Sequence, residues 1–430
     1  MIMTWNKVAN YEHISSMKPR FISRAFSPES QQKSVAFSNE LIPDTDNGVL
    51  KTKLLYSQGS DIFELDCSYP LIYGDEGDEN PKEPVQEYGD AFKDMENVPL
   101  TTKWVYQGET VSKMRYLGEE EDANMIAMSK NGSLAWFTDG VKVPVHIVQE
   151  MMGPSTKFSS IHSLTRNDEL AVADFDLSVD QETIVKSQSS GNEEDSILKL
   201  VDNDGKPSEV LRTIRVPGTT VTHSVRFLDN HVFASCSDDN VIRFWDTRTA
   251  EKPLWSLCDP QNGSLTAFDV SQLSGNLFVT GFSTGIIKLW DARAVENATL
   301  DLTHRQNGEE PIQKEIANLY HAGGDTVVDL KFSYTTPTEF LSVGGNGNVY
   351  HWDAEYALSK YDPEDLDFEP QEATEELLNE SLKFLHTGGS RRNPSAYGSR
   401  NTVAWHPVIE GLVAHVDPDT LITTYLPYDN

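Results

Sequence analysis

Histidine and cysteine often act as nucleophiles, bases and metal ligands, and this chain has eleven histidines and three cysteines. Cys67, Cys236 and Cys258 are far apart, and no two histidines have the spacing of a zinc-binding helix. The chain also has no Gly-x-Ser-x-Gly turn for a nucleophile and no Gly-x4-Gly-Lys-Ser/Thr phosphate loop. We therefore expect no catalytic residue, no metal ion and no cofactor, and predict that the protein is not an enzyme.

Two neighbouring Trp-Asp-x-Arg motifs carry the arginines whose spacing is most distinctive, Arg248 and Arg293. These motifs resemble the paired motif found in substrate receptors of one class of cullin-RING ubiquitin ligase. The other interpretation is that each arginine pairs with a nearby carboxylate, because a guanidinium readily makes bidentate bonds. The second interpretation is favoured, and the first is kept as an alternative.

The elements that position these motifs form a repeat. "SDDNVIRFWDTR" at 237–248 recurs as "FSTGIIKLWDAR" at 282–293 and as "GGNGNVYHWDAE" at 344–355. Each copy has a turn residue, an apolar-polar alternation and a Trp-Asp pair, which is typical of one blade of a WD-repeat propeller. His223 and His321 lie near the starts of blades, and we interpret them as structural hydrogen-bonding residues.

Weaker copies of the pattern extend the repeat along the chain. When the rest of the chain is aligned to the spacing of the Trp-Asp repeats, seven equivalent positions are found. The aspartates of the three Trp-Asp pairs are Asp246, Asp291 and Asp353. The seven positions are Leu65, Phe137, Val201, Trp245, Trp290, Trp352 and Tyr425. The sequence therefore predicts an all-β, seven-bladed WD-repeat β-propeller with acidic loop insertions and one short helix.

The predicted propeller occupies residues 1–430 as a single domain. Residues 20–26, "RFISRAF", are the candidate closing strand, because propellers hide the edge of their last blade with a strand from the other end of the chain. Residues 360–400 form an acidic and helical insertion before the last blade. Thr374 is placed to cap its helix, and Leu377, Leu378, Leu382 and Leu385 have helical spacing. That helix either packs on the propeller or docks a partner; packing is favoured.

The charge balance restricts the class of partner. Asp and Glu number 67 against 35 Lys and Arg, which gives a net charge of −32. Such a surface repels nucleic-acid phosphates and favours basic protein faces. No apolar run is long enough for a membrane span. The candidate partner-binding residues of the insertion, besides the two motif arginines, are Asp362, Glu364, Asp365, Asp367, Arg391 and Arg392.

Several longer segments resemble the budding-yeast family of WD-repeat transcriptional modulators. They include "YEHISSMKPRFISR", "YSQGSDIFELD", "VPGTTVTHSVRF", "YHAGGDTVVDLKF", "GGSRR" and "AWHPVIE", and they span nearly the whole chain. Trp405-His406-Pro407 also gives a more distant likeness to histone-binding WD proteins of deacetylase and chromatin-assembly complexes.

The resemblance implies a nuclear, non-enzymatic scaffold that modulates transcription, including meiotic genes and silencing. It also implies an anchor that retains the small subunit of ribonucleotide reductase in the nucleus. The expected partners are proteins: that subunit, a histone deacetylase complex or histones, and a nuclear import receptor. A receptor is expected because the segment after Arg391-Arg392 is less basic here than in the family.

Overall fold

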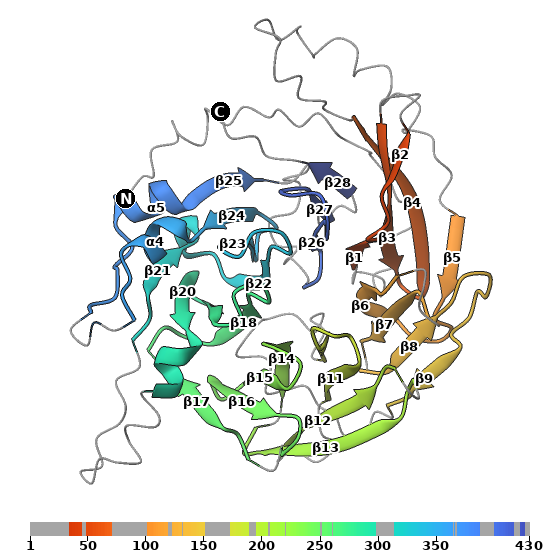
Figure 1. Ribbon diagram of the computed structural model, residues 1–430, viewed down its shortest axis with the longest axis horizontal. Coiled ribbons are helices and arrows are strands. Elements are labelled where there is room, and N and C mark those ends of the chain that lie inside the picture. The colour runs from red at the N-terminus through yellow and green to blue at the C-terminus, as the bar shows by residue number, and fades with distance from the viewer. Residues whose placement is uncertain are drawn as a thin grey trace, which may run out of the picture.

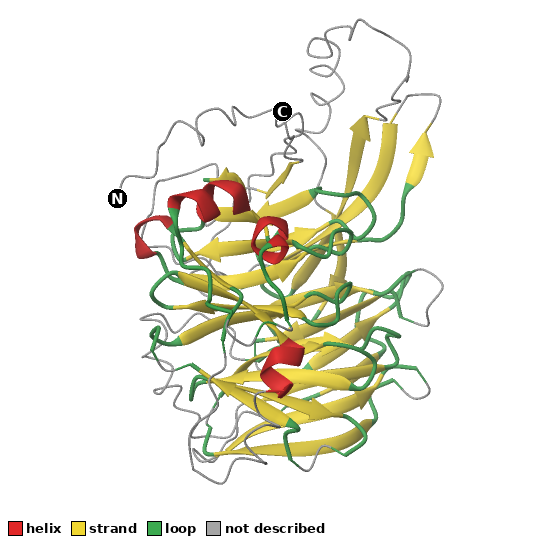
Figure 2. Ribbon diagram, turned by 60° about the vertical axis from the view of Figure 1, so that its left-hand side comes forward, coloured by secondary structure: helices red, strands yellow, loops and turns green. Residues whose placement is uncertain are grey.

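The chain folds into seven antiparallel sheets arranged as blades around one axis (Figure 1). The structure is a computed structural model. It describes residues 34–44, 49–70, 101–118, 123–130, 132–150, 173–188, 195–204, 207–219, 221–249, 252–259, 261–297, 314–363, 365, 368–387, 400–416 and 422–425. In the view of Figure 2 the sheets of neighbouring blades stack face to face, and helices lie on the outside of the ring. The prediction of a seven-bladed propeller is confirmed.

The first three blades use the amino-terminal half of the chain. Blade 1 contains β1 (Val35–Phe37), β2 (Ile42–Asp44), β3 (Val49–Gln58), β4 (Asp61–Pro70) and β5 (Thr101–Val105). Blade 2 contains β6 (Val111–Tyr116), β7 (Met125–Ser129), β8 (Leu134–Phe137) and β9 (His146–Val148). Blade 3 contains β10 (Phe175–Leu177), β11 (Thr183–Gln188), β12 (Asp195–Asp202) and β13 (Val210–Pro217).

The clearest sequence repeats form the next two blades. Blade 4 contains β14 (Thr222–Phe227), β15 (Val232–Ser237), β16 (Val241–Asp246) and β17 (Trp255–Cys258). Blade 5 contains β18 (Leu265–Val270), β19 (Leu277–Phe282), β20 (Ile286–Asp291) and β21 (Ala317–Tyr320).

Blade 6 carries two of the three named helices. Blade 6 contains β22 (Val327–Phe332), β23 (Glu339–Gly344), β24 (Val349–Asp353) and β25 (Leu382–His386). Blade 7 contains β26 (Val403–Trp405), β27 (Val413–Val416) and β28 (Ile422–Tyr425). The named helices are η3 (Ala322–Gly324), between blades 5 and 6, and α4 (Glu355–Ser359) and α5 (Glu375–Ser381), both between β24 and β25. Residues 292–297, directly after β20, are helical as well.

All seven repeat positions lie on the third strand of their blades, and all are buried. Even Leu65 and Val201, which lack the tryptophan, occupy this place on β4 and β12. The first strand of each blade lies nearest the axis, and the first strands of neighbouring blades contact one another (Figure 1). The first and third strands of each blade run toward the same side of the ring, which we call the lower face. The opposite side is the upper face.

The three tryptophan blades repeat one internal contact. In blade 5, Trp290 donates its indole N–H to the Thr280 hydroxyl at 2.9 Å and stacks on Phe278, with ring centroids 6.1 Å apart. Trp245 and Trp352 donate in the same way to Ser235 and Ser342, each ten residues upstream. A buried indole N–H needs such an acceptor, so the hydroxyl and the tryptophan together specify the blade.

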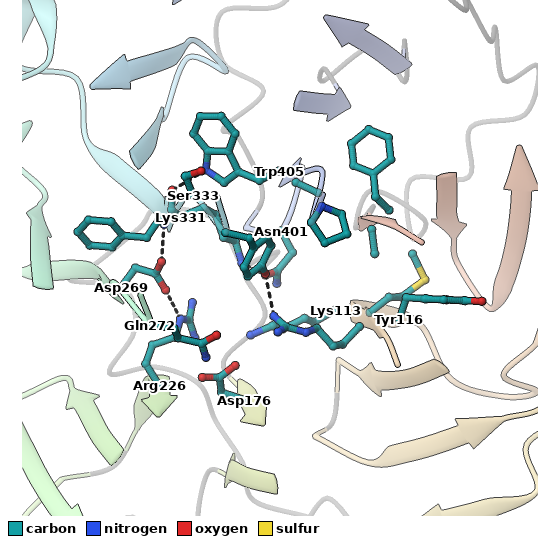
Figure 3. A pocket seen from close by; sticks show the side chains of 18 of the residues that line it. Lys113, Tyr116, Asp176, Arg226, Asp269, Gln272, Lys331, Ser333, Asn401 and Trp405 are labelled. Atoms are coloured by element: carbon teal, nitrogen blue, oxygen red, sulfur yellow. Dashed lines mark hydrogen bonds and ion pairs between the residues drawn. The ribbon is translucent and has the colours of Figure 1, made fainter. Parts of the chain in front are cut away.

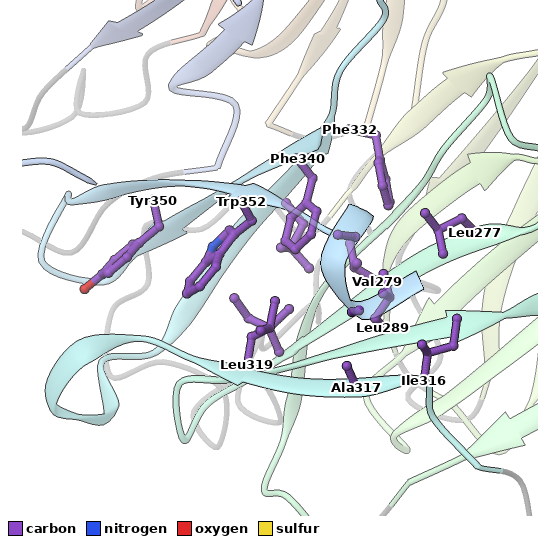
Figure 4. Packing of buried hydrophobic residues seen from close by; sticks show 14 of the residues in the cluster. Leu277, Val279, Leu289, Ile316, Ala317, Leu319, Phe332, Phe340, Tyr350 and Trp352 are labelled. Carbon is purple, nitrogen blue, oxygen red and sulfur yellow. The ribbon is translucent and has the colours of Figure 1, made fainter. Parts of the chain in front are cut away.

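Blades 5 and 6 share the largest part of the hydrophobic core (Figure 4). Trp352 and Phe340 lie on neighbouring strands of blade 6, and Leu289 and Leu319 face them from blade 5. Leu377 and Leu378 of α5 pack against the same core, each only 2% exposed. Helix α5 therefore covers the propeller side, as the favoured interpretation of the insertion holds.

The predicted extent of that helix is wrong. Thr374 does cap its start, since the hydroxyl accepts from the Leu377 N–H at 3.2 Å. Leu382 and Leu385, however, belong to β25, which pairs with β24 as the outer strand of blade 6. The leucine spacing fits both structures over so short a run, and pairing with an open strand edge outweighs a further helical turn.

Ring closure occurs between blades 7 and 1. Strand β1 packs against β26, and the Val35 N–H donates to the Asn401 carbonyl at 3.1 Å. The described part of blade 7 contains three strands. The candidate closing strand, 20–26, lies outside the described residues and stays a prediction.

Candidate protein-interaction site

The inner strands carry charged side chains that alternate in sign around the axis. Lys113 of β6 donates to the Asp174 carboxylate at 2.7 Å. Arg226 of β14 pairs with Asp174 on one side and with Asp269 of β18 on the other, the second pair at 2.5 Å. All four are buried. Burial acts to raise the pKa of Asp174, but the charges of Arg226 and Lys113 outweigh it and hold that pKa below its usual range.

Inner-strand carboxylates also join neighbouring blades at three boundaries, between blades 3 and 4, 5 and 6, and 6 and 7. In four places one of them accepts a backbone N–H from the following blade. The pairs are Asp174 with Val225 (3.2 Å), Asp176 with Phe227 (2.9 Å), Asp269 with Phe332 (2.6 Å) and Asp329 with Asn401 (2.7 Å). When a buried carboxylate pairs with a cation and also accepts a hydrogen bond from an amide N–H, both its charge and its hydrogen-bonding capacity are satisfied. These contacts fix the register between neighbouring blades.

Asn401 connects blades on both sides of the ring closure. Its side-chain amide donates to the Ser112 carbonyl of blade 2 at 3.1 Å, and its side-chain oxygen accepts from Lys331 of blade 6 at 3.1 Å. Its backbone has φ 64°, a left-handed conformation that asparagine tolerates better than most residues.

Side chains cross the axis near both faces. Toward the upper face, the half-buried Arg400 guanidinium donates to the carbonyls of His223 and Thr266, which belong to blades 4 and 5. Toward the lower face, Arg115 of blade 2 donates to the Tyr334 hydroxyl of blade 6 at 2.7 Å and lies 5.1 Å from its ring centroid. Each contact joins blades that are not neighbours in the ring, and the Arg115–Tyr334 contact lies on the lower face.

A pocket of about 330 Å³ opens there (Figure 3). All seven blades contribute to its lining, because it lies where the first strands end. The charged lining residues are Lys113, Arg115, Asp176, Arg226, Asp269 and Lys331. Four cations against two carboxylates give the pocket a positive excess in a chain whose net charge is −32.

Sequence analysis missed these inner residues, although a signal was present. Each interrupts a short apolar first strand with a charge, as Arg226 does in "SVRF" and Asp269 does in "AFDV". A lone charge in an otherwise buried strand predicts an ion pair. Which charges meet depends on ring closure, and that is not visible in a local pattern.

Arg248 and Arg293 lie on the lower face outside this pocket, just after the third strands of blades 4 and 5: Arg248 in a turn and Arg293 in the short helical segment 292–297. Each makes a bidentate pair with the aspartate of its own motif: Arg248 with Asp246 at 2.9 and 2.7 Å, and Arg293 with Asp291 at 3.1 and 2.8 Å. Hydrogen bonds from Arg248 lower the pKa of Asp246 to about 2. The arginine side chains nevertheless remain 67% and 59% exposed.

The two histidines that the sequence predicts to be structural, His223 and His321, make different contacts. His321 Nε2 lies 2.6 Å from the Ser342 hydroxyl, which also accepts from Trp352, and burial lowers the His321 pKa to about 3. His223 instead contacts Arg400 and the Cys236 thiol, so it has no direct bond to a tryptophan.

Only part of the acidic insertion can be placed. Asp362 and Asp365 are exposed between α4 and α5. Glu364, Asp367, Arg391 and Arg392 lie outside the described residues. Within the described ranges, no cluster of His, Cys, Asp and Glu has the geometry of a metal site, and no helix is long and apolar enough to cross a membrane.

The fold and the repeated Trp-Asp strands define a WD-repeat propeller. The family model for the WD domain, G-beta repeat, matches residues 209–246. Over 427 residues the chain is 62% identical to transcriptional modulator WTM1 of Saccharomyces cerevisiae, covering 98% of this chain and 96% of the relative. Transcriptional modulator WTM2 of the same yeast is 59% identical (97% and 93% covered), and transcriptional regulatory protein UME1 is 41% identical (97% and 91%).

These likenesses extend over nearly the full length of both chains. The chain therefore belongs to the yeast family of WD-repeat transcriptional modulators.

Proposed function

We propose that this protein is a nuclear, non-catalytic scaffold that modulates transcription by bringing other proteins together. The near full-length identity to two transcriptional modulators and one transcriptional regulatory protein carries the proposal. The propeller supports it, because a rigid ring presents loops from seven blades on one face. The described charged residues near the axis are satisfied mainly by one another, which suits a structural role better than proton transfer.

A more specific proposal, about target genes and partner proteins, follows from the family resemblance. The scaffold would act on meiotic genes and in silencing, and would retain the small subunit of ribonucleotide reductase in the nucleus. A deacetylase complex or histones, and an import receptor, are the further partners proposed.

Affinity purification from nuclear extract, followed by quantitative mass spectrometry, tests this proposal. A tagged parent chain should recover the reductase small subunit or deacetylase subunits in near-stoichiometric amounts, whereas the tag alone should not. Recovery of neither class, from nuclei that contain the chain, would contradict the more specific proposal.

A second candidate is a substrate receptor of a cullin-RING ubiquitin ligase. The observation that favours it is the exposure of Arg248 and Arg293 on one face. We expect no adaptor binding, because each arginine is already paired within its own motif. Adaptor bound by the parent chain and lost in the Arg248→Ala, Arg293→Ala double variant would establish the ligase role instead.

A further inference from the structure

The rim of the lower pocket is apolar although it faces solvent. Val179, Leu273 and Val408 are each 52% exposed and Tyr334 is 37% exposed. All four lie in the turn between the first and second strands of a blade, in blades 3, 5, 7 and 6 respectively. Val179, Leu273 and Tyr334 line the pocket itself. Exposed apolar side chains gathered around a concave site are typical of a surface that another molecule covers.

The floor beneath this rim holds two cations that have no ion pair. Lys113 and Arg226 are neutralised by Asp174 and Asp269. In the part of the chain that the structure describes, Lys331 bonds only to the neutral Asn401 amide, and Arg115 only to the neutral Tyr334 hydroxyl. Both line the pocket and are half-buried.

These two features constrain what can cover the pocket. An apolar partner lying on the rim would remove water from Lys331 and Arg115. A desolvated cation without a counter-ion is unfavourable, so the partner must supply a carboxylate as well as apolar surface. Together the rim and the floor describe a complementary ligand, with apolar side chains outside and an acidic one at the centre.

We propose that the lower pocket binds an extended peptide segment of a partner protein, in which one Asp or Glu side chain is flanked by apolar residues. The carboxylate pairs with Lys331 and Arg115, and the flanking side chains contact Val179, Leu273 and Tyr334. A volume of about 330 Å³ is at the lower end of the range for binding pockets and suits a few side chains of a segment that crosses the rim.

Nucleic acid is the weaker candidate for the same cations. A strand brings a row of phosphates toward a chain of net charge −32, and the carboxylates of Asp176 and Asp269 line the same pocket. A single acidic side chain meets the two unpaired cations without placing further anions against these carboxylates.

The inference rests on the proposed function, because it names a surface through which the scaffold takes a partner. The peptide-binding proposal and the proposed scaffold function can fail separately. Peptide binding is measured on the purified full chain, whereas the scaffold role is judged by proteins recovered from nuclei.

The test uses two pools of fluorescein-labelled, amidated nonapeptides with apolar, serine or glycine flanking positions. One pool has Glu at the centre and the other has Gln. Fluorescence polarisation with the full chain should show at least about tenfold tighter binding of the Glu pool, the effect of one charge-assisted pair. Equal binding of the two pools, or binding of neither, would overturn the proposal.

Variants then locate the site. Lys331→Gln and Arg115→Gln should each weaken binding of the Glu pool by about tenfold and leave the Gln pool unchanged. Arg248→Gln is the matched control, since it removes an exposed arginine of the same face outside the pocket. Because Lys331→Gln also loses a bond to Asn401 and Arg115→Gln loses a bond to Tyr334, each variant is first shown to melt cooperatively, and the assignment requires that both weaken binding of the Glu pool.

The rim is tested in the same assay. Leu273→Asp should abolish binding of the Glu pool, because it adds a negative charge beside the carboxylate. Ile147→Asp is the control: Ile147 is 49% exposed and lies on β9, the outer strand of blade 2. Equal effects of these two substitutions would overturn the assignment. Tighter binding of a labelled single-stranded oligonucleotide that is lost in Lys331→Gln would likewise overturn it, in favour of phosphate recognition.

Discussion

At the scale of single residues, blades 4, 5 and 6 are specified by a hydroxyl, an indole and an aromatic ring that recur at fixed spacing. Phe278, Thr280 and Trp290 lie on two neighbouring strands of blade 5, with the indole bonded to the hydroxyl and stacked on the ring. Trp290 is only 2% exposed. The contacts of this residue are structural, and its loss should lower stability directly.

We predict that Trp290→Ala lowers the free energy of unfolding by about 3–5 kcal/mol, the range for large aromatic residues replaced in a core. Urea or thermal unfolding of the purified chain measures the change. Ile147→Ala serves as the control, because Ile147 is half exposed on an outer strand. An unchanged midpoint for a soluble Trp290→Ala protein would show that the repeat frame is misplaced.

Asn401 provides a second residue-scale prediction. Asn401→Ala should cost about 3 kcal/mol, since it loses the bonds to Ser112 and Lys331 and places alanine in a left-handed conformation. Asn401→Gly loses the same bonds but adopts φ 64° freely, so its loss should be smaller by roughly 1 kcal/mol. Denaturant titration compares the two. Equal losses would mean that the backbone conformation contributes nothing.

Residue patterns predicted the blade positions but not the site at the axis. Leu65 and Val201 were found because strand alternation and turn residues hold the frame even without a tryptophan. Lys331 and Arg115 were not found, because they lie far apart in the sequence and come to line one pocket only when the ring closes. Whether these two cations can bind a ligand depends on whether the neighbouring carboxylates are already paired with other cations.

At the scale of elements, the seam between blades 6 and 7 is built from histidines. His351 of β24 bonds to the Tyr425 hydroxyl of β28 at 2.8 Å. His386 of β25 stacks on Tyr425 and lies 5.2 Å, ring to ring, from His415 of β27. Burial lowers the pKa of His351 to about 3 and the pKa of His415 well below its usual value. His351 and His415 are therefore neutral in the folded chain near neutral pH.

Stability should fall as the pH drops below about 6.5. The unfolded histidines then bind protons, whereas His351 stays neutral in the folded chain until about pH 3. Each such residue should cost about 2 kcal/mol at pH 5 relative to neutral pH. His351→Gln keeps a hydrogen-bonding group but does not titrate. Unfolding measured at pH 7.5 and pH 5 should show a smaller pH effect in this variant; an identical pH effect would rule His351 out.

Element boundaries were predicted less well than element positions. The leucines from Leu377 to Leu385 fit a helix, but the structure divides them between α5 and β25. Blade 6 needs an outer strand, and Leu382–His386 supplies it. Pairing with the open edge of the neighbouring strand therefore outweighs the helical spacing of the leucines.

At the scale of the whole molecule, the net charge of −32 should affect how fast partners arrive. The acidic insertion between α4 and α5 includes the exposed Asp362 and Asp365. The pocket on the lower face holds the opposite local charge. A partner that meets both would carry a mixed-charge face, with basic groups toward the insertion.

We predict that association with such a partner slows as salt rises, because steering is screened beyond about 8 Å at physiological ionic strength. Neutralising Asp362, Glu364, Asp365 and Asp367 together should slow association further, while the dissociation rate changes little. Stopped-flow or surface-binding kinetics across a salt series measures both rates. An association rate indifferent to salt and to these substitutions would make the insertion a solubilising loop only.

The central claim is that this propeller modulates transcription as a nuclear scaffold, and rapid depletion tests it most directly. A degradation tag removes the chain from nuclei, and nascent transcripts are sequenced before secondary effects accumulate. The account predicts a prompt change in a defined set of genes, meiotic genes among them, that an untagged copy of the chain prevents. Unchanged nascent transcription after complete depletion would contradict the account.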